Sequence, residues 1–381
     1  MVSIVGGLRS PIGKTNGAFK NILPEDIVSQ LLNNILNKYH LPKESIDELI
    51  LGNCVGPGGN IARLSLLKSH FPYQSVGTTI DFQCGSALKA INLGAALIKS
   101  GQRDLIIAGG VESTSLEPKK QYNKKDPRYI NSDAFYKRAQ FSPFEIGDPD
   151  MIKGAENVSI LKNISKNEMD KWALKSHKRA LYTRDNNILS DIISPININD
   201  KTIYSDQGIK KTITQRLLKK VQPIYEGGNL TAGNSCLTHD GGALILLASE
   251  NAVSKYKLNP IAKFVNEANI GVDPNLSPLG PVSSINSLLQ KENLSIDDID
   301  LFEINEAFAV RVIACMRELN LCENKLNILG GALAYGHPYG ASGAIIMLHL
   351  IKGLQITNKK IGIASLGVAG GLGISTLIKR C

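Results

Sequence analysis

The stretch Ser45-Ile46-Asp47-Glu48-Leu49-Ile50-Leu51-Gly52-Asn53 is the main indication of the fold, because the 381-residue chain contains a second copy about 252 residues later. The second copy reads Ser295-Ile296-Asp297-Asp298-Ile299-Asp300-Leu301-Phe302-Glu303-Ile304-Asn305. In each copy a polar turn that ends a helix leads into a short apolar strand, which finishes at an asparagine. A repeat at a fixed offset indicates that one structural unit occurs twice in the chain.

A second repeated feature follows each copy. Cys84 opens a helix of small residues that precedes an apolar strand over 104–110, and His337 opens a matching helix before a strand over 361–367. Cys84 and His337 therefore occupy equivalent places, 253 residues apart. A chance match between low-complexity stretches is the competing explanation, and several anchors at nearly one offset argue against it. Apolar strands alternating with helices predict an α/β protein with largely parallel sheets, covered by helices on both faces.

Composition limits the class of protein. With 43% hydrophobic and 20% charged residues, the chain is expected to form two or three packed units. No apolar run approaches the ~18–20 residues of a membrane span, and the amino terminus does not read as a signal peptide, so we expect a cytoplasmic protein without membrane association. The six cysteines lack metal-ligand spacing, so we expect reduced thiols and no metal site.

The net charge of +9 is concentrated in one segment. Residues 117–225 hold 21 Lys and Arg against 13 Asp and Glu, a net charge of +8. Nucleic acid, an anionic membrane face and a polyanionic small ligand could each attract such a segment, but it contains no nucleic-acid-reading motif, so we expect no nucleic-acid partner. We interpret 117–225 as an insertion into a first half made of 1–116 and 226–257, with 258–381 as the second half.

Cys84 and His337 are the first candidates for chemistry. A thiol at the start of a helix feels the positive end of the helix dipole, which favours the thiolate and predicts a lowered pKa for Cys84. An inert buried cysteine is the alternative. His337 lies in the Gly- and Pro-rich segment 330–343, where a rigidly held imidazole could take the thiol proton or donate to a carbonyl oxygen. A structural loop histidine is the alternative there.

Two further stretches place polar groups at the ends of strands. Asn305 ends the second copy of the repeat and begins a helix, at a position where α/β sites gather polar side chains; a role as a helix N-cap is the alternative. The glycine-rich run 365–373 lacks the GxGxxG spacing of a dinucleotide loop. Its backbone N–H groups could instead stabilise a developing oxyanion.

The order of motifs resembles the thiolase family, which makes and cleaves 3-oxoacyl-CoA through a cysteine-bound acyl group. The resemblance covers essentially the whole chain and rests on the following stretches: 9–14 (RSPIGK), 58–63 (GGNIAR), 83–87 (QCGSA), 108–113 (AGGVES), 154–157 (GAEN), 231–235 (TAGNS), 305–308 (NEAF) and 336–338 (GHP). It implies a thiolase-like fold of two duplicated βαβαβαββ halves in a five-layered arrangement, with an inserted loop domain. It also implies a homodimer or homotetramer that acts on acyl-CoA and CoA without a permanently bound cofactor.

The resemblance also implies roles for individual residues. Cys84 would be the nucleophile that accepts the acyl group, and His337 would activate it and help to bind the thioester oxygen. Asn305 would position a water that completes this first oxyanion site. The backbone amides of Cys84 and Ala369 would form the second oxyanion site, around the acyl-enzyme carbonyl.

The same matching assigns residues to substrate binding. Met151, Ala232 and Phe308 would line the pantetheine tunnel, and Cys236 stands where relatives often place a serine that touches pantetheine. The histidine that often precedes the methionine is Asp150 here. The basic segment 117–225 would hold CoA, whose phosphates make it a polyanion.

Gly367 is the main departure from the family pattern, because thiolases usually place a second, acid/base cysteine at this position. Glycine has no proton to transfer, and general acid/base catalysis typically contributes about 10²–10⁴-fold. A Gly367→Cys variant is therefore expected to raise turnover if this group is limiting. His239, Glu306 and Cys315 are candidates for a replacement, whereas Cys381 lies beyond a predicted final strand and is not expected to reach.

Three hypotheses follow. The leading one is an acetyl-CoA C-acetyltransferase or 3-oxoacyl-CoA thiolase that works through an acyl-cysteine. The second is an acyltransferase or thioesterase of thiolase fold that lacks Claisen activity because of Gly367. The third is a non-catalytic protein that uses the frame for assembly only, and the joint presence of Cys84, His337 and Asn305 argues against it.

Overall fold

The first half of the chain contains the expected succession of strands and helices. The computed structural model describes residues 1–129, 135–136 and 138–381. The elements of this half are β1 (Val2–Arg9), α1 (Pro24–Tyr39), β3 (Glu48–Gly52), α2 (Ile61–Lys68), β4 (Val76–Ile80), α3 (Ser86–Lys99), β5 (Leu105–Glu112) and, after the insertion, β10 (His239–Ala248). A two-residue strand, β2 (Gly13–Lys14), pairs with β10. The order is βαβαβαββ.

The second half repeats this order after the linking helix α7 (Glu250–Lys255). Its elements are β11 (Ala262–Gly271), α8 (Gly280–Glu292), β12 (Leu301–Ile304), α9 (Ala309–Glu318), α10 (Ala332–Tyr335), α11 (Ser342–Ile356), β13 (Ile361–Val368) and β14 (Leu372–Arg380). The counterpart of β4 is reduced to one bridge, between Phe302 and Leu326. The duplication expected from the sequence is therefore present in the fold.

One continuous sheet runs through both halves. Its strand order is β12-β13-β14-β11-β1-β10-β5-β3-β4, so the two halves have matching orders and meet where β1 pairs with β11. Only the pairs β3–β4, β3–β5 and β12–β13 among these described strands are parallel. The expectation of largely parallel sheets was wrong, because the last strand of each half returns antiparallel beside its predecessor.

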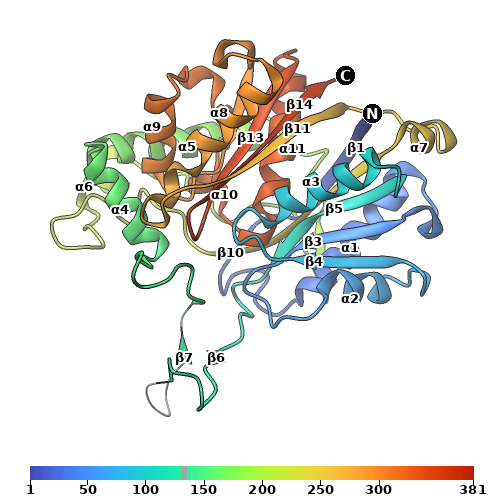
Figure 1. The fold of residues 1–381 in the computed structure, drawn as a ribbon, viewed down its shortest axis with the longest axis horizontal. Helices are drawn as coiled ribbons and strands as arrows, with labels where there is room; N and C mark the ends of the chain where they lie inside the picture. The colour runs from blue at the N-terminus through green and yellow to red at the C-terminus, as the bar shows by residue number, and fades with distance from the viewer. Residues whose placement is uncertain (130–134, 137) are drawn as a thin grey trace.

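Helices cover and separate the two halves of the sheet (Figure 1). Helices α3 and α11 pack against each other between them and share one apolar core with β1, β10 and β13. Helices α1 and α2 close the outer side of the first half, and α8 and α9 close that of the second. The succession of helix, sheet, helix, sheet and helix makes five layers, as the resemblance implied.

The insertion between β5 and β10 carries its own elements. They are β6 (Lys120–Gln121), β7 (Phe135–Tyr136), α4 (Met151–Leu161), α5 (Lys166–Asp185), β8 (Ile196–Ile198), β9 (Lys201–Ile203) and α6 (Gln215–Lys220). Helices α4 and α5 pack on α9 of the second half, while β6 and β7 extend away from the layers (Figure 1). The boundaries at 116/117, 225/226 and 257/258 remain predictions. None of the described helices is long and apolar enough to cross a bilayer.

Candidate active site

Cys84 lies in a tight turn between β4 and α3. The residue before it, Gln83, has a φ of +46°, which is uncommon for a residue with a side chain. The hydroxyl of Ser86 supports the turn, since its Oγ accepts from the backbone N of Phe82 at 2.8 Å and donates to the carbonyl oxygen of Gln83 at 2.6 Å. Backbone strain held by surrounding contacts is common at functional sites.

The surroundings of Cys84 oppose its thiolate form, which the start of helix α3 was expected to favour. The side chain is only 8% exposed. Burial raises the pKa of the Cys84 thiol to about 11, and the positive charge of Arg311 acts in the opposite direction. The prediction of a lowered pKa from position alone was therefore wrong, because desolvation outweighs the helix end. A nearby base or cation is needed to make this thiol a nucleophile.

His337 is held in a defined orientation by its neighbours. Its Nδ1 lies 2.5 Å from the Oγ of Ser342, and that hydroxyl donates to the carbonyl oxygen of Pro338 at 3.0 Å. The hydroxyl hydrogen is thus used, so Nδ1–H of His337 is the donor to Ser342 and Nε2 is left as an acceptor. Burial lowers the pKa of His337 to about 3, which keeps the imidazole neutral and also makes it a weaker base.

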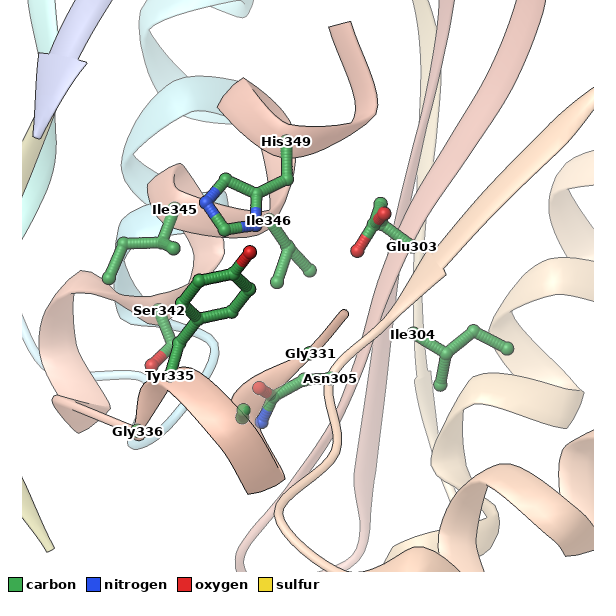
Figure 2. Close-up of a pocket in the computed structure, with 11 residues that line it drawn as sticks. Glu303, Ile304, Asn305, Gly331, Tyr335, Gly336, Ser342, Ile345, Ile346 and His349 are labelled. Atoms are coloured by element: carbon green, nitrogen blue, oxygen red, sulfur yellow. The ribbon is translucent and has the colours of Figure 1, made fainter. Parts of the chain in front are cut away.

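Asn305 lies against the accepting nitrogen of His337. Its Nδ2 is 3.3 Å from Nε2, while its Oδ1 is buried and has no hydrogen-bond partner in the described part of the chain. Figure 2 shows Asn305 after β12 and Ser342 in the first turn of α11, both lining one small pocket. The free Oδ1 fits a group that positions a water molecule.

Close packing of two helix starts brings the two halves of the site together. A Cβ atom on Gly343, in the first turn of α11, would lie 2.3 Å from the backbone N of Leu88 in α3. Gly340, which follows His337, donates its N–H to the buried carboxylate of Glu112 at 3.0 Å. The ring of Tyr339 stands edge-on to His337 with centroids 5.1 Å apart. Burial raises the pKa of Tyr339, and the charges of Cys236 and Cys84 act in the same direction.

The segment around Cys236 pairs with the segment that follows Asn305. The backbone N of Cys236 donates to the carbonyl oxygen of Ala307 at 2.9 Å, and Ser235 forms a bridge with Phe308. Burial raises the pKa of the Cys236 thiol to about 12, and the charge of Cys84 contributes in the same direction. Cys236 therefore lies near the candidate nucleophile, and Phe308 is joined to the same segment through Ser235. The pantetheine contacts of Cys236 and Phe308 stay a prediction.

The glycine-rich loop closes the site from the second half. Ala369 begins the turn between β13 and β14, next to Gly370 with a φ of +81°. This loop lies beside the Cys84 turn, since a Cβ atom on Gly85 would be 2.9 Å from Cγ2 of Val368. The role of the backbone N–H groups of Cys84 and Ala369 as a second oxyanion site stays a prediction.

Met151 and Ala232 are placed in the insertion and after it. Met151 is the first residue of α4 and packs partly buried against the core of the second half. Asp150 caps this helix, because its side chain accepts from the backbone N of Lys153 at 2.8 Å. Ala232 lines a small pocket together with Lys14 and Lys210. Among the described residues, no hydrogen bond joins Met151 or Ala232 to Cys84.

Gly367 has no room for the side chain that the sequence comparison suggested. A Cβ atom there would lie 2.7 Å from the backbone carbonyl oxygen of Ser277, 3.1 Å from Cδ of Pro281 and 3.2 Å from Nε of Arg311. The backbone oxygen cannot move without shifting the Pro274–Leu279 turn. We therefore no longer expect Gly367→Cys to raise turnover.

We expect Gly367→Cys to lower the free energy of unfolding by roughly 1–3 kcal/mol, typical of an overpacked core, and to leave turnover unimproved. Urea unfolding followed by circular dichroism measures the first effect, and acetoacetyl-CoA cleavage measures the second. Gly271→Cys is the matched control, since Gly271 ends β11 and a Cβ atom there has nothing within 4 Å. A Gly367→Cys protein as stable as the wild type and more active would contradict this expectation.

The three candidates for a replacement base, and Cys381, differ in position. Cys381 is exposed and follows β14, at the opposite end of that strand from the glycine-rich loop. Cys315 is fully buried in α9. Glu306 accepts from Trp172, Ser176, Asn327 and the backbone of Leu333. His239 contacts the segment of the candidate base, because its Nδ1 accepts from the backbone N of His337 at 3.2 Å.

Sequence reasoning missed three residues that shape this site. Ser342 orients His337, and Glu112 binds the backbone of Gly340 and of Cys54. Arg311 is the third, a fully buried arginine whose charge acts on both Cys84 and His337. A lone charge within the apolar run 307–315 was the available signal for Arg311. The pairings of Ser342 and Glu112 have no comparable signal.

Comparison with known families agrees with this architecture. The thiolase N-terminal domain matches residues 2–251, and the thiolase C-terminal domain matches residues 258–380. Relatives from Staphylococcus epidermidis strain RP62A and Staphylococcus aureus strain MRSA252, provisionally named acetyl-CoA C-acetyltransferase VraB, are each 39% identical over 377 and 380 residues. Both alignments cover 99% of this chain and 98% of the relative.

Solved structures show the same likeness in three dimensions. The acetyl-CoA acetyltransferase of Bacillus anthracis has a TM-score of 0.94 and 33% identity, over 100% of this chain and 98% of that one. Human mitochondrial 3-ketoacyl-CoA thiolase has a TM-score of 0.93 and 31% identity, over 100% of this chain and 99% of its own. A structure of that human enzyme in complex with CoA also matches, at a TM-score of 0.93. The chain therefore belongs to the thiolase family and is an enzyme of thiolase type.

Proposed function

We propose that the protein transfers acyl groups between CoA thioesters through an acyl-cysteine on Cys84, by cleaving 3-oxoacyl-CoA with CoA or by joining two acetyl-CoA molecules. The observation that carries this proposal is the arrangement of His337. A neutral imidazole, buried beside Asn305 and fixed through Ser342, presents Nε2 as an acceptor. This arrangement suits a base that takes the proton of a buried thiol.

The chemistry of cleavage can be balanced with these groups. His337 accepts the proton of Cys84, the sulfur attacks the 3-oxo carbon, and the bond between carbons 2 and 3 breaks. The proton on His337 is then available to the departing acetyl-CoA carbanion. In the second half-reaction CoA gives its thiol proton to His337, attacks the acyl-cysteine and releases Cys84, which takes the proton back. The free Oδ1 of Asn305 supports water binding at the first oxyanion site.

A second candidate function follows from Gly367. The crowding by Ser277 and Arg311 leaves no side chain at this position, and we infer that it stands where thiolases carry their acid/base cysteine. Without that group an acyl-enzyme could instead pass its acyl group to water or to another thiol, as a thioesterase or simple acyltransferase does. His239, beside His337, is the remaining candidate for a second proton carrier.

One assay distinguishes the two candidate functions. Acetoacetyl-CoA consumption by the wild-type protein is measured with and without added CoA, while the products are identified by chromatography. Thiolytic cleavage predicts consumption that depends on CoA and forms two acetyl-CoA molecules. Consumption that is equally fast without CoA, with free acid as product, would show the thioesterase instead.

Substrate binding is assigned on the same basis. We propose that CoA is a substrate rather than a resident cofactor, that Met151, Ala232, Cys236 and Phe308 contact its pantetheine, and that the basic segment 117–225 attracts its phosphates. Lys14 and Lys210 beside Ala232 support a polyanion at this end of the site. A homodimer or homotetramer in the cytoplasm is part of the same proposal.

A further inference from the structure

Arg311 is a buried charge near Cys84 to which the acyl-transfer chemistry assigns no role. It lies in the first turn of α9 and its side chain is 0% exposed. Nη1 makes a long hydrogen bond of 3.4 Å to the carbonyl oxygen of Asn305. Nε and Nη2 have no hydrogen-bond partner in the part of the chain that the structure describes. Because an unpaired buried guanidinium is costly, we expect the working enzyme to hold an anion beside it.

The neighbours of Arg311 indicate which anion this is. No carboxylate within the described residues forms an ion pair with Arg311, and the groups whose charges act on it are the thiols of Cys84, Cys315 and Cys236. Burial raises the pKa of Cys84 to about 11, and those of Cys236 and Cys315 to about 12. Cys84 is the thiol whose turn packs against Val368, the neighbour of Gly367, and Gly367 in turn lies beside Arg311.

Gly367 makes the position of Arg311 possible. Since a Cβ atom on residue 367 would lie 3.2 Å from Nε of Arg311, a side chain there would press against the guanidinium. Gly367 and Arg311 are 56 positions apart in the sequence, yet they are close neighbours in the fold. The departure from the family pattern at Gly367 is thus linked to the buried cation.

We propose that Arg311 balances the negative charge of the Cys84 thiolate and thereby makes this thiol available as the nucleophile. The inference rests on the proposed role of Cys84 in acyl transfer. Arg311 acts through Cys84 and is a positioning residue.

Several other titratable groups lie near Cys84 and also affect the ionisation of its thiol. Glu112 from β5 and Asp81 after β4 both oppose the thiolate. The thiols of Cys54 and Cys236 also lie within its reach, as does the phenol of Tyr339 after His337. His337 is neutral, so it supplies no charge. Arg311 is the cation that acts on Cys84 among these groups of the described chain.

The test is the pH dependence of alkylation of Cys84 by iodoacetamide in the full-length protein, followed by mass spectrometry of the Cys84 peptide. Arg311→Gln and Arg311→Met are expected to raise the midpoint of the profile by one pH unit or more. The rate at pH 8 then falls about tenfold or more, because a shift of one unit changes the thiolate fraction tenfold. Arg311→Lys keeps the charge and is expected to restore part of the shift.

The control variant removes a different arginine, Arg179, which is partly buried. Arg179→Gln loses contacts to the carbonyl oxygen of Leu326 and to the ring of Trp172, away from Cys84, and is expected to keep the wild-type profile. Circular dichroism establishes which variants fold. A folded Arg311→Gln or Arg311→Met protein that alkylates with the wild-type profile overturns the proposal.

The unaltered protein provides an independent test that needs no variant. Among its buried thiols, Cys84 is expected to alkylate at a lower pH than Cys236 or Cys315, and an equal or higher midpoint for Cys84 overturns the proposal. Because iodoacetamide requires neither CoA nor turnover, these results are separate from the acetoacetyl-CoA assay. A wild-type protein that fails that assay but shows the Arg311-dependent shift would refute the proposed function and leave the charge pairing intact.

Discussion

Cys84→Ala is expected to lower CoA-dependent cleavage of acetoacetyl-CoA by roughly 10⁴-fold or more, as in other enzymes that lose a covalent nucleophile. The physical reason is that the sulfur forms the bond to the acyl carbon, and alanine has no atom that can replace it. Mass spectrometry after incubation with acetoacetyl-CoA is expected to show an acetyl adduct on the Cys84 peptide of the wild type and no adduct on the variant.

The control for this prediction is a cysteine away from the site. Cys322 is exposed, after α9, and Cys322→Ala is expected to keep wild-type turnover. Cys84→Ala removes one buried sulfur atom, so its circular dichroism spectrum should match that of the wild type. A correctly folded Cys84→Ala protein that retains more than a tenth of the activity would show that acyl transfer does not pass through Cys84.

His337→Gln is expected to lower kcat/KM by about 10²–10⁴-fold, the usual contribution of a general base. Glutamine can still donate to Ser342 and accept from Asn305, so the variant tests proton transfer more than packing. Acylation of Cys84, measured by rapid quenching and mass spectrometry, should slow by the same factor. Loss of less than threefold in that rate would exclude His337 as the base.

The depressed pKa of His337 gives this prediction a pH signature. With the pKa of the folded protein at about 3 and an unfolded value near 6.5, the neutral imidazole contributes stability that is present above pH 6.5 and lost as the pH falls toward 3. The wild type should therefore lose more stability between pH 6.5 and pH 3 than His337→Gln does. His40→Asn, at the exposed end of α1, should behave like the wild type. The catalytic rate should show no loss near pH 6.5 from protonation of His337.

Much of the frame could be predicted because it follows from local pattern. The repeated turn and strand at 45–53 and 295–305 predicted two equivalent halves, and the matching strand orders show them. The direction of the last strand in each half could not be predicted, because the apolar pattern of a buried strand is the same in either direction. The loss of the β4 counterpart at Leu326 has the same origin, since strand pairing depends on neighbours far away in the sequence.

The candidate site divides in a similar way. The repeated pattern in the sequence predicted that Cys84 and His337 precede equivalent helices, and α3 and α11 follow them, although α11 begins only at Ser342. It also predicted that Asn305 and a glycine-rich loop follow strands, and these are the neighbouring strands β12 and β13. The electrostatics of the site could be read only from the folded protein. Burial reversed the expected pKa of Cys84, and residues 311 and 367 met in a space that no local pattern describes. Desolvation and charge pairing depend on what surrounds a group in three dimensions, and chain neighbours supply little of that surrounding.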